Sequence, residues 1–117
     1  MLIPYKKDYE KTAMGLLSYL PDFKNLQNLQ DEMRLYSVDD SHKLYLYRNS
    51  DRNIVGVAGV QLGRGCQVLR YLSLAPGFRD DEHQSAIMHE LVQEDPKRKL
   101  MTVPEYTYLL KYLSDDE

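Results

Sequence analysis

The sequence predicts an α/β fold in which a mostly antiparallel sheet is flanked by helices. Apolar residues recur at helical spacing before residue 37, which favours two helices early in the chain. Three strand-like runs joined by short turns follow between residues 43 and 74. A helix, a strand and a last helix are expected after them. The predicted order is therefore β-α-α-β-β-β-α-β-α.

The first third of the chain predicts a short strand followed by two helices. Pro4 cannot donate to a strand ladder, so residues 2–5 are expected to form a short edge strand. One apolar stripe stops at Pro21, and a second begins after Asp22, a residue typical of a helix N-cap. The two stripes consist of Tyr9, Ala13, Leu16, Leu17 and Leu20, and of Phe23, Leu26, Leu29, Met33 and Tyr36.

The middle of the chain predicts three antiparallel strands. Residues 43–48 are rich in aromatic and aliphatic side chains, and residues 54–60 spell Ile-Val-Gly-Val-Ala-Gly-Val. The polar segment between them indicates a hairpin turn. Gly63 and Gly65 indicate a second turn, after which residues 68–74 form the third strand.

The last third predicts a helix, a buried strand and an amphipathic helix. Residues 84–92 show a helical apolar face, and the Asp95-Pro96 pair ends that helix. Residues 99–103 are expected to form a buried strand. The final helix follows from apolar side chains at positions i, i+3, i+4 and i+7, which are Tyr106, Leu109, Leu110 and Leu113.

Composition limits the classes of protein that this chain can represent. With 117 residues, 43% of them hydrophobic and 28% charged, it fits one soluble domain over residues 1–117. The net charge of -3 and scattered basic residues argue against nucleic-acid partners and an anionic membrane surface. No segment resembles a signal peptide or membrane span. We therefore expect a cytoplasmic protein whose partners are small molecules or proteins.

Neither a metal site nor a dinucleotide site is expected. Cys66 is the only cysteine, so an internal disulfide and a thiolate metal cluster are excluded. The three histidines lack metal-ligand spacing and are expected to be solvated; they are His42, His83 and His89. The glycines at 56 and 59 lie within a predicted strand and precede no helix, which argues against a dinucleotide-binding fingerprint.

The junction after the third strand is the main candidate for function. A strand that ends near Pro76 and leads into a helix exposes unpaired N–H groups, which bind anions such as phosphates. Three consecutive carboxylates at positions 80–82 oppose this, because they repel phosphates and cap the helix themselves. Two interpretations remain open: the carboxylates occupy the anion site, or Arg79, Ser85 and mobile nearby lysines hold phosphates while the acidic side chains turn toward water.

The element order and two motifs resemble the GCN5-related N-acetyltransferase (GNAT) superfamily over nearly the whole chain. The motifs are the Ile-Val-Gly-Val-Ala-Gly-Val run at 54–60 and Leu-Ser-Leu-Ala-Pro at 72–76, which is followed by Arg79 and a helix. The opening segment Met-Leu-Ile-Pro-Tyr-Lys-Lys-Asp-Tyr-Glu-Lys-Thr-Ala-Met-Gly-Leu-Leu-Ser, residues 1–18, is similar to the RibT family, small acetyltransferase-like proteins encoded within some bacterial riboflavin operons.

The resemblance implies a GNAT-like fold and a CoA thioester, acetyl-CoA, as co-substrate. In this superfamily the strand that matches residues 69–74 splays from its neighbour and pairs with the pantetheine arm of the cofactor, which assigns that contact to Leu72 and Leu74. Arg79, Gln84 and Ser85 are the further cofactor-binding candidates at the junction. The implied reaction is direct acyl transfer to a small-molecule or protein amine.

Two positions depart from the superfamily pattern, and one tyrosine matches its general acid. Glu82 and Gln84 stand where the phosphate loop of the superfamily has glycine or alanine, so a diphosphate cannot approach the backbone as closely. The resemblance implies that Tyr112 protonates the departing thiolate. Tyr112 and Tyr108, one helical turn before it, both lie off the predicted apolar face of the last helix.

A second interpretation places the chain in a different functional class. It keeps the GNAT fold as a catalytically degenerate binding or regulatory module that does not bind CoA productively. Larger relatives continue into further strands beyond the position of Glu117, so we expect one wall of the acceptor pocket either to be missing or to come from a partner, such as a second copy in a homo-oligomer. A link to riboflavin biosynthesis follows only from the operon resemblance.

Overall fold

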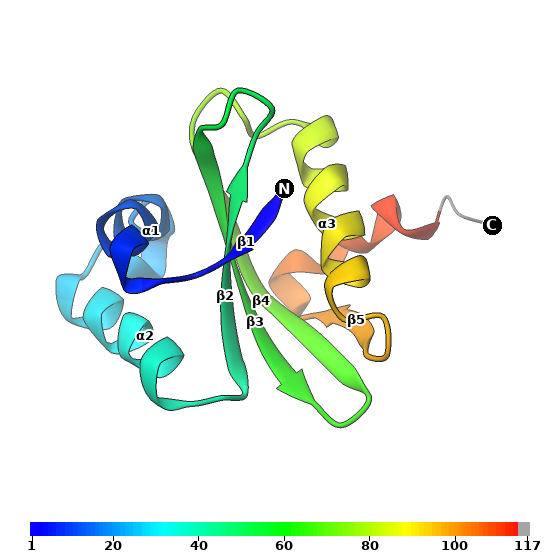
Figure 1. The fold of residues 1–117 in the computed structure, drawn as a ribbon, viewed down its shortest axis with the longest axis horizontal. Coiled ribbons are helices and arrows are strands. Elements are labelled where there is room, and N and C mark those ends of the chain that lie inside the picture. Colours follow the sequence, from blue (N-terminus) through cyan, green and yellow to red (C-terminus); the bar gives the residue numbers. More distant parts are fainter. Residues whose placement is uncertain (115–117) are drawn as a thin grey trace.

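The fold is known from a computed structural model and is described for residues 1–114 (Figure 1). In chain order, with η denoting a 3₁₀ helix, the elements are β1 (Leu2–Pro4), η1 (Lys7–Tyr9), α1 (Glu10–Leu17), η2 (Pro21–Phe23), α2 (Leu26–Val38), β2 (His42–Arg48), β3 (Ile54–Gly63), β4 (Cys66–Leu74), α3 (Asp81–Glu94), β5 (Lys99–Thr102) and η3 (Pro104–Tyr112).

The five strands form one sheet in the order β1-β2-β3-β4-β5. Strands β1 to β4 pair antiparallel, whereas β4 and β5 are parallel and are joined by the crossover helix α3. Helices α1 and α2 lie on one side of the sheet, and α3 and η3 lie on the other (Figure 1). The sequence-predicted order of elements and the mostly antiparallel sheet are confirmed.

Two hydrophobic cores, one on each side of the sheet, hold these layers together. Because β3 is central and covered on both sides, its residues from Val55 to Val60 are all buried. Apolar burial on both sides is the main favourable contribution to the stability of such a fold. The α1–α2 side contains Ala13, Leu16, Leu17, Leu29 and Met33, and the α3 side contains Ile87, Met88, Leu91 and Leu109.

Strand β4 leaves its neighbour β5 halfway along its length. The parallel pairing with β5 covers only Cys66 to Leu69, and the backbone N–H of Val103 makes a last bond to the Leu69 carbonyl (3.0 Å). On the other side, the register between β3 and β4 shifts at Gly59, so that Arg70 is the extra residue of a β-bulge. The second half of β4 therefore pairs with β3 alone.

Two local predictions are wrong at the start of a helix, and a third is wrong about the type of the last helix. The N-cap of α2 is Asn25, whose side chain accepts a bond from the Asn28 N–H (3.1 Å), because residues 21–23 form a separate 3₁₀ turn and delay the helix. Helix α3 begins at Asp81 rather than at residue 84. The last helix is a 3₁₀ helix with three residues per turn, which changes the residues that share a face.

Candidate functional site

The free edge of β4 borders a cleft of about 250 Å³, which we call the β4 cleft. It collects four of the sequence-predicted site residues, Leu72, Leu74, Arg79 and Gln84, from β4, the following loop and α3. The other residues in its wall are Tyr19, Leu20, Ser73 and Tyr108. Parallel pairing that stops at Leu69 thus produces the splayed strand that the sequence resemblance implied.

The backbone of Leu72 and Leu74 points into the β4 cleft. The N–H of Ala75 bonds to Val55 on β3 (2.8 Å), and in an antiparallel pair alternate residues turn their polar groups the other way. Two contacts fit this direction. The Leu74 carbonyl accepts a bond from Arg79 Nε (2.7 Å), and the backbone of Leu72 faces the hydroxyl of Tyr106 and acts to lower its pKa. The edge is therefore covered by side chains of this chain.

Arg79 turns toward the strand and away from the helix that follows it. Its Nε donates to the Leu74 carbonyl, and its guanidinium carbon lies 5.0 Å from the centre of the Tyr19 ring. A guanidinium over an aromatic face is attracted by the ring electrons. In this arrangement Arg79 forms part of the wall of the β4 cleft.

The N-terminus of α3 contains its own carboxylate. Asp80 accepts hydrogen bonds from the backbone N–H of His83 (2.8 Å) and from His83 Nδ1 (2.7 Å). These bonds, led by the one from the backbone, lower the pKa of Asp80 and favour the charged form. Of the two interpretations of the acidic loop, the one in which a carboxylate occupies the anion site holds for Asp80.

The expectation that the histidines are solvated is wrong for His83 and His42, whose side chains are largely buried. The His83 side chain is only 22% exposed because it packs edge-on against Phe78 and Tyr47, with ring centres 5.4 and 6.4 Å apart. His42 is 11% exposed and contacts the Asp39 carboxylate at 2.9 Å. Each histidine has a neighbouring aspartate three residues before it, a pattern visible in the sequence.

Tyr112 and Ser85 lie beside the β4 cleft rather than in its wall. Tyr112 donates a hydrogen bond to Asp81 Oδ1 (2.6 Å), and its hydroxyl lies 2.9 Å from the Gln84 side-chain oxygen. The bond to Asp81 is the main reason that the pKa of Tyr112 rises to about 12. Ser85 lies further along α3, where its carbonyl accepts a bond from His89 Nδ1 (2.8 Å).

The prediction that Tyr112 lies off the apolar face of its helix is wrong. In a 3₁₀ helix residues three apart share a face, so Tyr106, Leu109 and Tyr112 align. Leu109 is fully buried, and the other two pack against the same core. Tyr108 is the residue that reaches the β4 cleft, with 54% of its surface exposed.

A buried ionic cluster at the β-bulge was not anticipated from the sequence. Glu32 of α2 is 7% exposed and accepts bonds from Arg70 Nη2 (3.1 Å), Tyr71 (2.8 Å) and Tyr36 (2.9 Å), with a further contact to Arg70 Nη1. Burial raises the pKa of Glu32, but these bonds outweigh it and the pKa lies below its usual value. We call these four residues the Glu32 cluster. The sequence does contain one indication of this cluster: Glu32 lies three residues after Leu29, within the apolar stripe of α2.

Gly59 makes room for the Glu32 cluster on the sheet. A methyl group at this position would overlap the Tyr71 ring and the Tyr36 hydroxyl. The hydroxyl oxygens of these two tyrosines are 2.5 Å apart, so neither ring has space to retreat without losing its bond. A glycine within the run at 54–60 is thus explained by packing.

A second pocket of about 250 Å³ lies on the Glu32-cluster side of β4. Its lining includes Arg70 and Tyr71 of the cluster and two carboxylates, Asp22 and Glu105. Leu20 borders both this pocket and the β4 cleft. We call it the acidic pocket. Its remaining wall consists of Pro21, Phe23, Val103 and Tyr106.

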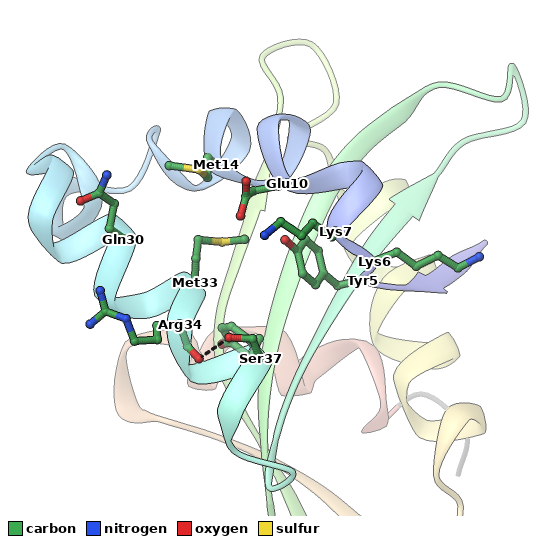
Figure 2. Close-up of a pocket in the computed structure, with 10 residues that line it drawn as sticks. Tyr5, Lys6, Lys7, Glu10, Met14, Gln30, Met33, Arg34 and Ser37 are labelled. Atoms are coloured by element: carbon green, nitrogen blue, oxygen red, sulfur yellow. Dashed lines mark hydrogen bonds between the residues drawn. The ribbon is translucent and has the colours of Figure 1, made fainter.

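A hollow of about 770 Å³ lies between α1 and α2, and none of the sequence-predicted site residues lines it. Figure 2 shows Lys7, Glu10 and Met33 directed into the space between the two helices, whereas Lys6 points away from it. Arg34, a further lining residue, is paired with Asp31 at 3.3 Å. Because its charges are mixed and it lies away from the splayed strand edge, volume alone does not make it the functional site.

Two further searches were restricted to the part of the chain described. Residues 1–114 contain no group of three His, Cys, Asp or Glu side chains arranged to hold a metal ion. Within the same residues, no helix has the length and apolar character needed to cross a membrane.

Comparison with solved structures defines the fold class. The chain matches an acetyltransferase related to histone acetyltransferase HPA2 from Corynebacterium glutamicum with a TM-score of 0.72 and 12% identity, over 97% of this chain and 82% of that one. It matches aminoglycoside 6'-N-acetyltransferase AAC(6')-Ih from Acinetobacter baumannii at 0.68 and 10%, over 99% and 86%. Aminoglycoside N-acetyltransferase AAC(6')-Iy, solved in complex with CoA, matches at 0.67 and 15%, over 98% and 84%. These proteins share the fold of GNAT acetyltransferases.

A relative in sequence gives the family. The chain is 33% identical over 102 residues to an uncharacterized N-acetyltransferase of Bacillus methanolicus encoded in the region 3' of lysA, covering 86% of this chain and 84% of the relative. A scan against models of protein families finds no match. With its GNAT-like fold and splayed fourth strand, the chain belongs to the GNAT superfamily of N-acetyltransferases.

Proposed function

We propose that this protein transfers an acetyl or other acyl group from a CoA thioester to an amine, with the thioester arm in the β4 cleft. The observation that supports this most directly is the free edge of β4, where the backbone of Leu72 and Leu74 points into a cleft beside Arg79 and Gln84. An extended ligand with amide groups pairs with such an edge as an added strand would. To do so it displaces Arg79 and Tyr106 from the edge.

The proposed reaction needs no covalent enzyme intermediate. The amine nitrogen attacks the thioester carbonyl carbon, a C–N bond forms, and the C–S bond breaks. A base takes the proton that the nitrogen loses, and an acid returns a proton to the departing thiolate. We assign the acid to Tyr112. Its bond to Asp81 raises the pKa to about 12 and makes the hydroxyl a weaker acid, so this bond must be exchanged before the proton is donated.

We assign the amine acceptor to the acidic pocket. The carboxylates of Asp22 and Glu105 favour a positively charged group, and an amine that approaches from this side reaches β4 opposite the β4 cleft. Both a small-molecule amine and a protein amine fit this assignment. The similarity of residues 1–18 to riboflavin-operon proteins makes amines of riboflavin biosynthesis the first acceptors to test.

The alternative is a GNAT-fold module that binds no CoA productively. It is favoured by the carboxylate already present at the N-terminus of α3 and by Arg79, which faces Leu74 rather than that helix. Calorimetry with acetyl-CoA separates the two functions. The proposed enzyme binds acetyl-CoA with a measurable Kd. Absence of binding at millimolar acetyl-CoA would favour the GNAT-fold module that binds no CoA.

The roles of the two tyrosines are tested with a matched pair of variants. Thiol release from acetyl-CoA is followed over a panel of amines for the unmodified protein, Tyr112→Phe and Tyr108→Phe. Loss of a general acid lowers kcat by about 100-fold or more with little change in KM. We expect this for Tyr112→Phe, and only a change in KM for Tyr108→Phe, since Tyr108 lines the β4 cleft. The reverse result would transfer the acid role to Tyr108.

A further inference from the structure

The two ends of the β4 cleft offer different chemistry to an acyl donor. A CoA thioester has an uncharged pantetheine arm with two amide groups and a nucleotide part that contains a diphosphate. At the strand end, Leu72 and Leu74 direct uncharged N–H and C=O groups into the cleft. At the other end, just beyond Gln84 in the cleft wall, lies the N-terminus of α3, where a diphosphate would find backbone N–H groups.

That helix terminus is already filled by negative charge. The Asp80 carboxylate takes the N–H of His83, and the N–H of Gln84 is used by the helix itself, bonded to the Asp80 carbonyl (3.1 Å). Asp81 and Glu82 place two more carboxylates in the first turn. A diphosphate at this position would meet three negative side chains at close range.

The positive groups nearby do not restore a phosphate site. Arg79 is bonded to the Leu74 carbonyl and packed against Tyr19, and the imidazole of His83 contacts Asp80. Lys111 lies over the Tyr112 ring, with its Nζ 5.1 Å from the ring centre, and supplies one opposing charge beside Asp81. Carboxylates outnumber the cations that remain for a ligand.

We propose that this protein recognises its acyl donor through the pantetheine thioester arm alone and gains no affinity from the nucleotide diphosphate. This inference rests on the proposed function, since it concerns the donor of the same acyl transfer. It predicts that pantetheine thioesters without a nucleotide bind and react as well as the corresponding CoA thioesters. Glu82 contributes to this selectivity through its charge alone, because it lies in the first turn of α3 and does not line the β4 cleft.

The test compares three ligands by calorimetry on the unmodified chain: acetyl-CoA, S-acetylpantetheine, and adenosine 3'-phosphate 5'-diphosphate, which is the nucleotide part alone. We expect the first two Kd values to agree within about threefold, a difference of less than 1 kcal/mol, and no binding of the nucleotide at millimolar concentration. Acetyl-CoA that binds 30-fold or more tighter than S-acetylpantetheine would overturn the inference and leave the proposed function intact. If neither thioester binds, both fail.

Salt and a charge variant supply independent readouts of the same electrostatics. Raising the ionic strength shortens the Debye length to about 3 Å at 1 M and should tighten acetyl-CoA binding while S-acetylpantetheine is unchanged. Glu82→Gln should tighten acetyl-CoA about fivefold and leave S-acetylpantetheine unchanged, on the scale of one charge pair removed near the surface. Glu94→Gln, at the far end of the same helix, is the matched control and should alter neither. Equal effects of Glu82→Gln on both thioesters would contradict the proposal.

Discussion

The edge of β4 lies in the β4 cleft and the N-terminus of α3 lies beside it, next to Gln84 in the cleft wall, and the two are filled in different ways. The strand edge is covered by side chains that a ligand can displace, because Arg79 and Tyr106 each make contacts that a ligand amide can replace. The helix terminus is capped by Asp80, which follows directly in the chain and is part of the helix itself. Main-chain groups at a strand edge can thus stay available to a ligand while a helix terminus beside them is occupied by the chain's own charge.

The edge of β4 is also supported by a buried ion pair, and the N-terminus of α3 has no corresponding contact among the described residues. Arg70 is the extra residue of the β4 bulge, and its guanidinium is held by the buried Glu32 carboxylate of α2. A bulge bends the strand that contains it and increases its twist, which turns the rest of β4 away from β5. The Glu32 cluster therefore joins α2 to the point where the β4 cleft opens.

Of the substitutions considered, removal of the Glu32 carboxylate, which supports the β4 edge, should have the largest effect on stability. Glu32→Ala leaves the Arg70 charge and two tyrosine hydroxyls without their buried partner, and we expect it to lower the free energy of unfolding by about 3 kcal/mol. Urea unfolding measures this difference. Asp31→Ala, the neighbouring exposed carboxylate paired with Arg34, should cost no more than about 0.5 kcal/mol. Equal losses of unfolding free energy in the two variants would show that the Glu32 cluster does not stabilise the fold in particular.

A methyl group at Gly59 should disturb the same support by crowding it. Gly59→Ala overlaps the Tyr71 ring and the Tyr36 hydroxyl, and overpacking of this kind should cost about 2 kcal/mol. Gly15 in α1 has nothing within 4 Å of an added Cβ, so Gly15→Ala should stabilise the protein by about 0.5–1 kcal/mol. Opposite shifts in the melting temperature check both. A stabilising Gly59→Ala would show that the tyrosine pair is loosely packed.

Acid should weaken the strand half through Glu32. Its folded pKa lies below the usual value near 4.3, so the carboxylate stabilises the fold above about pH 4.3 and loses that effect as the pH falls through the folded pKa. The unfolding free energy of Glu32→Gln should therefore fall less steeply below pH 4.3 than that of the unmodified protein. Asp39 and Asp80, whose pKa values are also lowered, are present in both proteins and cancel in the comparison. Parallel pH profiles would contradict the assignment.

The helix half should respond least in stability. Asp80→Ala removes the cap of α3 and should lower the melting temperature slightly, whereas Asp80→Asn keeps an N-cap side chain and should not. Both variants remove the charge and should tighten acetyl-CoA. A thermal melt and a calorimetric titration on the same samples check the two effects. Weaker acetyl-CoA binding in both variants would show that Asp80 supports the ligand rather than opposing it.

The sequence predicted what depends on local pattern. The order of the elements followed from apolar spacing and from turns such as the one at Gly63. Resemblance to GNAT proteins made Leu72, Leu74, Arg79, Gln84 and Ser85 cofactor-binding candidates, and all of these except Ser85 line one cleft. The fold side of that prediction is confirmed, while the chemical roles of these residues stay predictions.

What the sequence missed depends on contacts between distant residues or on a change of helix type. The bond between Arg79 and Leu74 and the cluster around Glu32 join segments whose proximity only the fold determines. The 3₁₀ geometry of η3 rotated Tyr112 onto the core face, because a spacing of i, i+3 fits both kinds of helix. Side-chain direction at the site was accordingly the least predictable feature.

Amide chemical shifts measured by NMR during an acetyl-CoA titration test the central claim most directly, because they report on both halves of the cleft in one experiment. If the donor binds along the strand edge and not at the helix terminus, the amides of Leu72 and Leu74 shift strongly and those of Glu82 and His83 stay nearly fixed. Large shifts at Glu82 and His83 with unmoved strand amides would contradict the account.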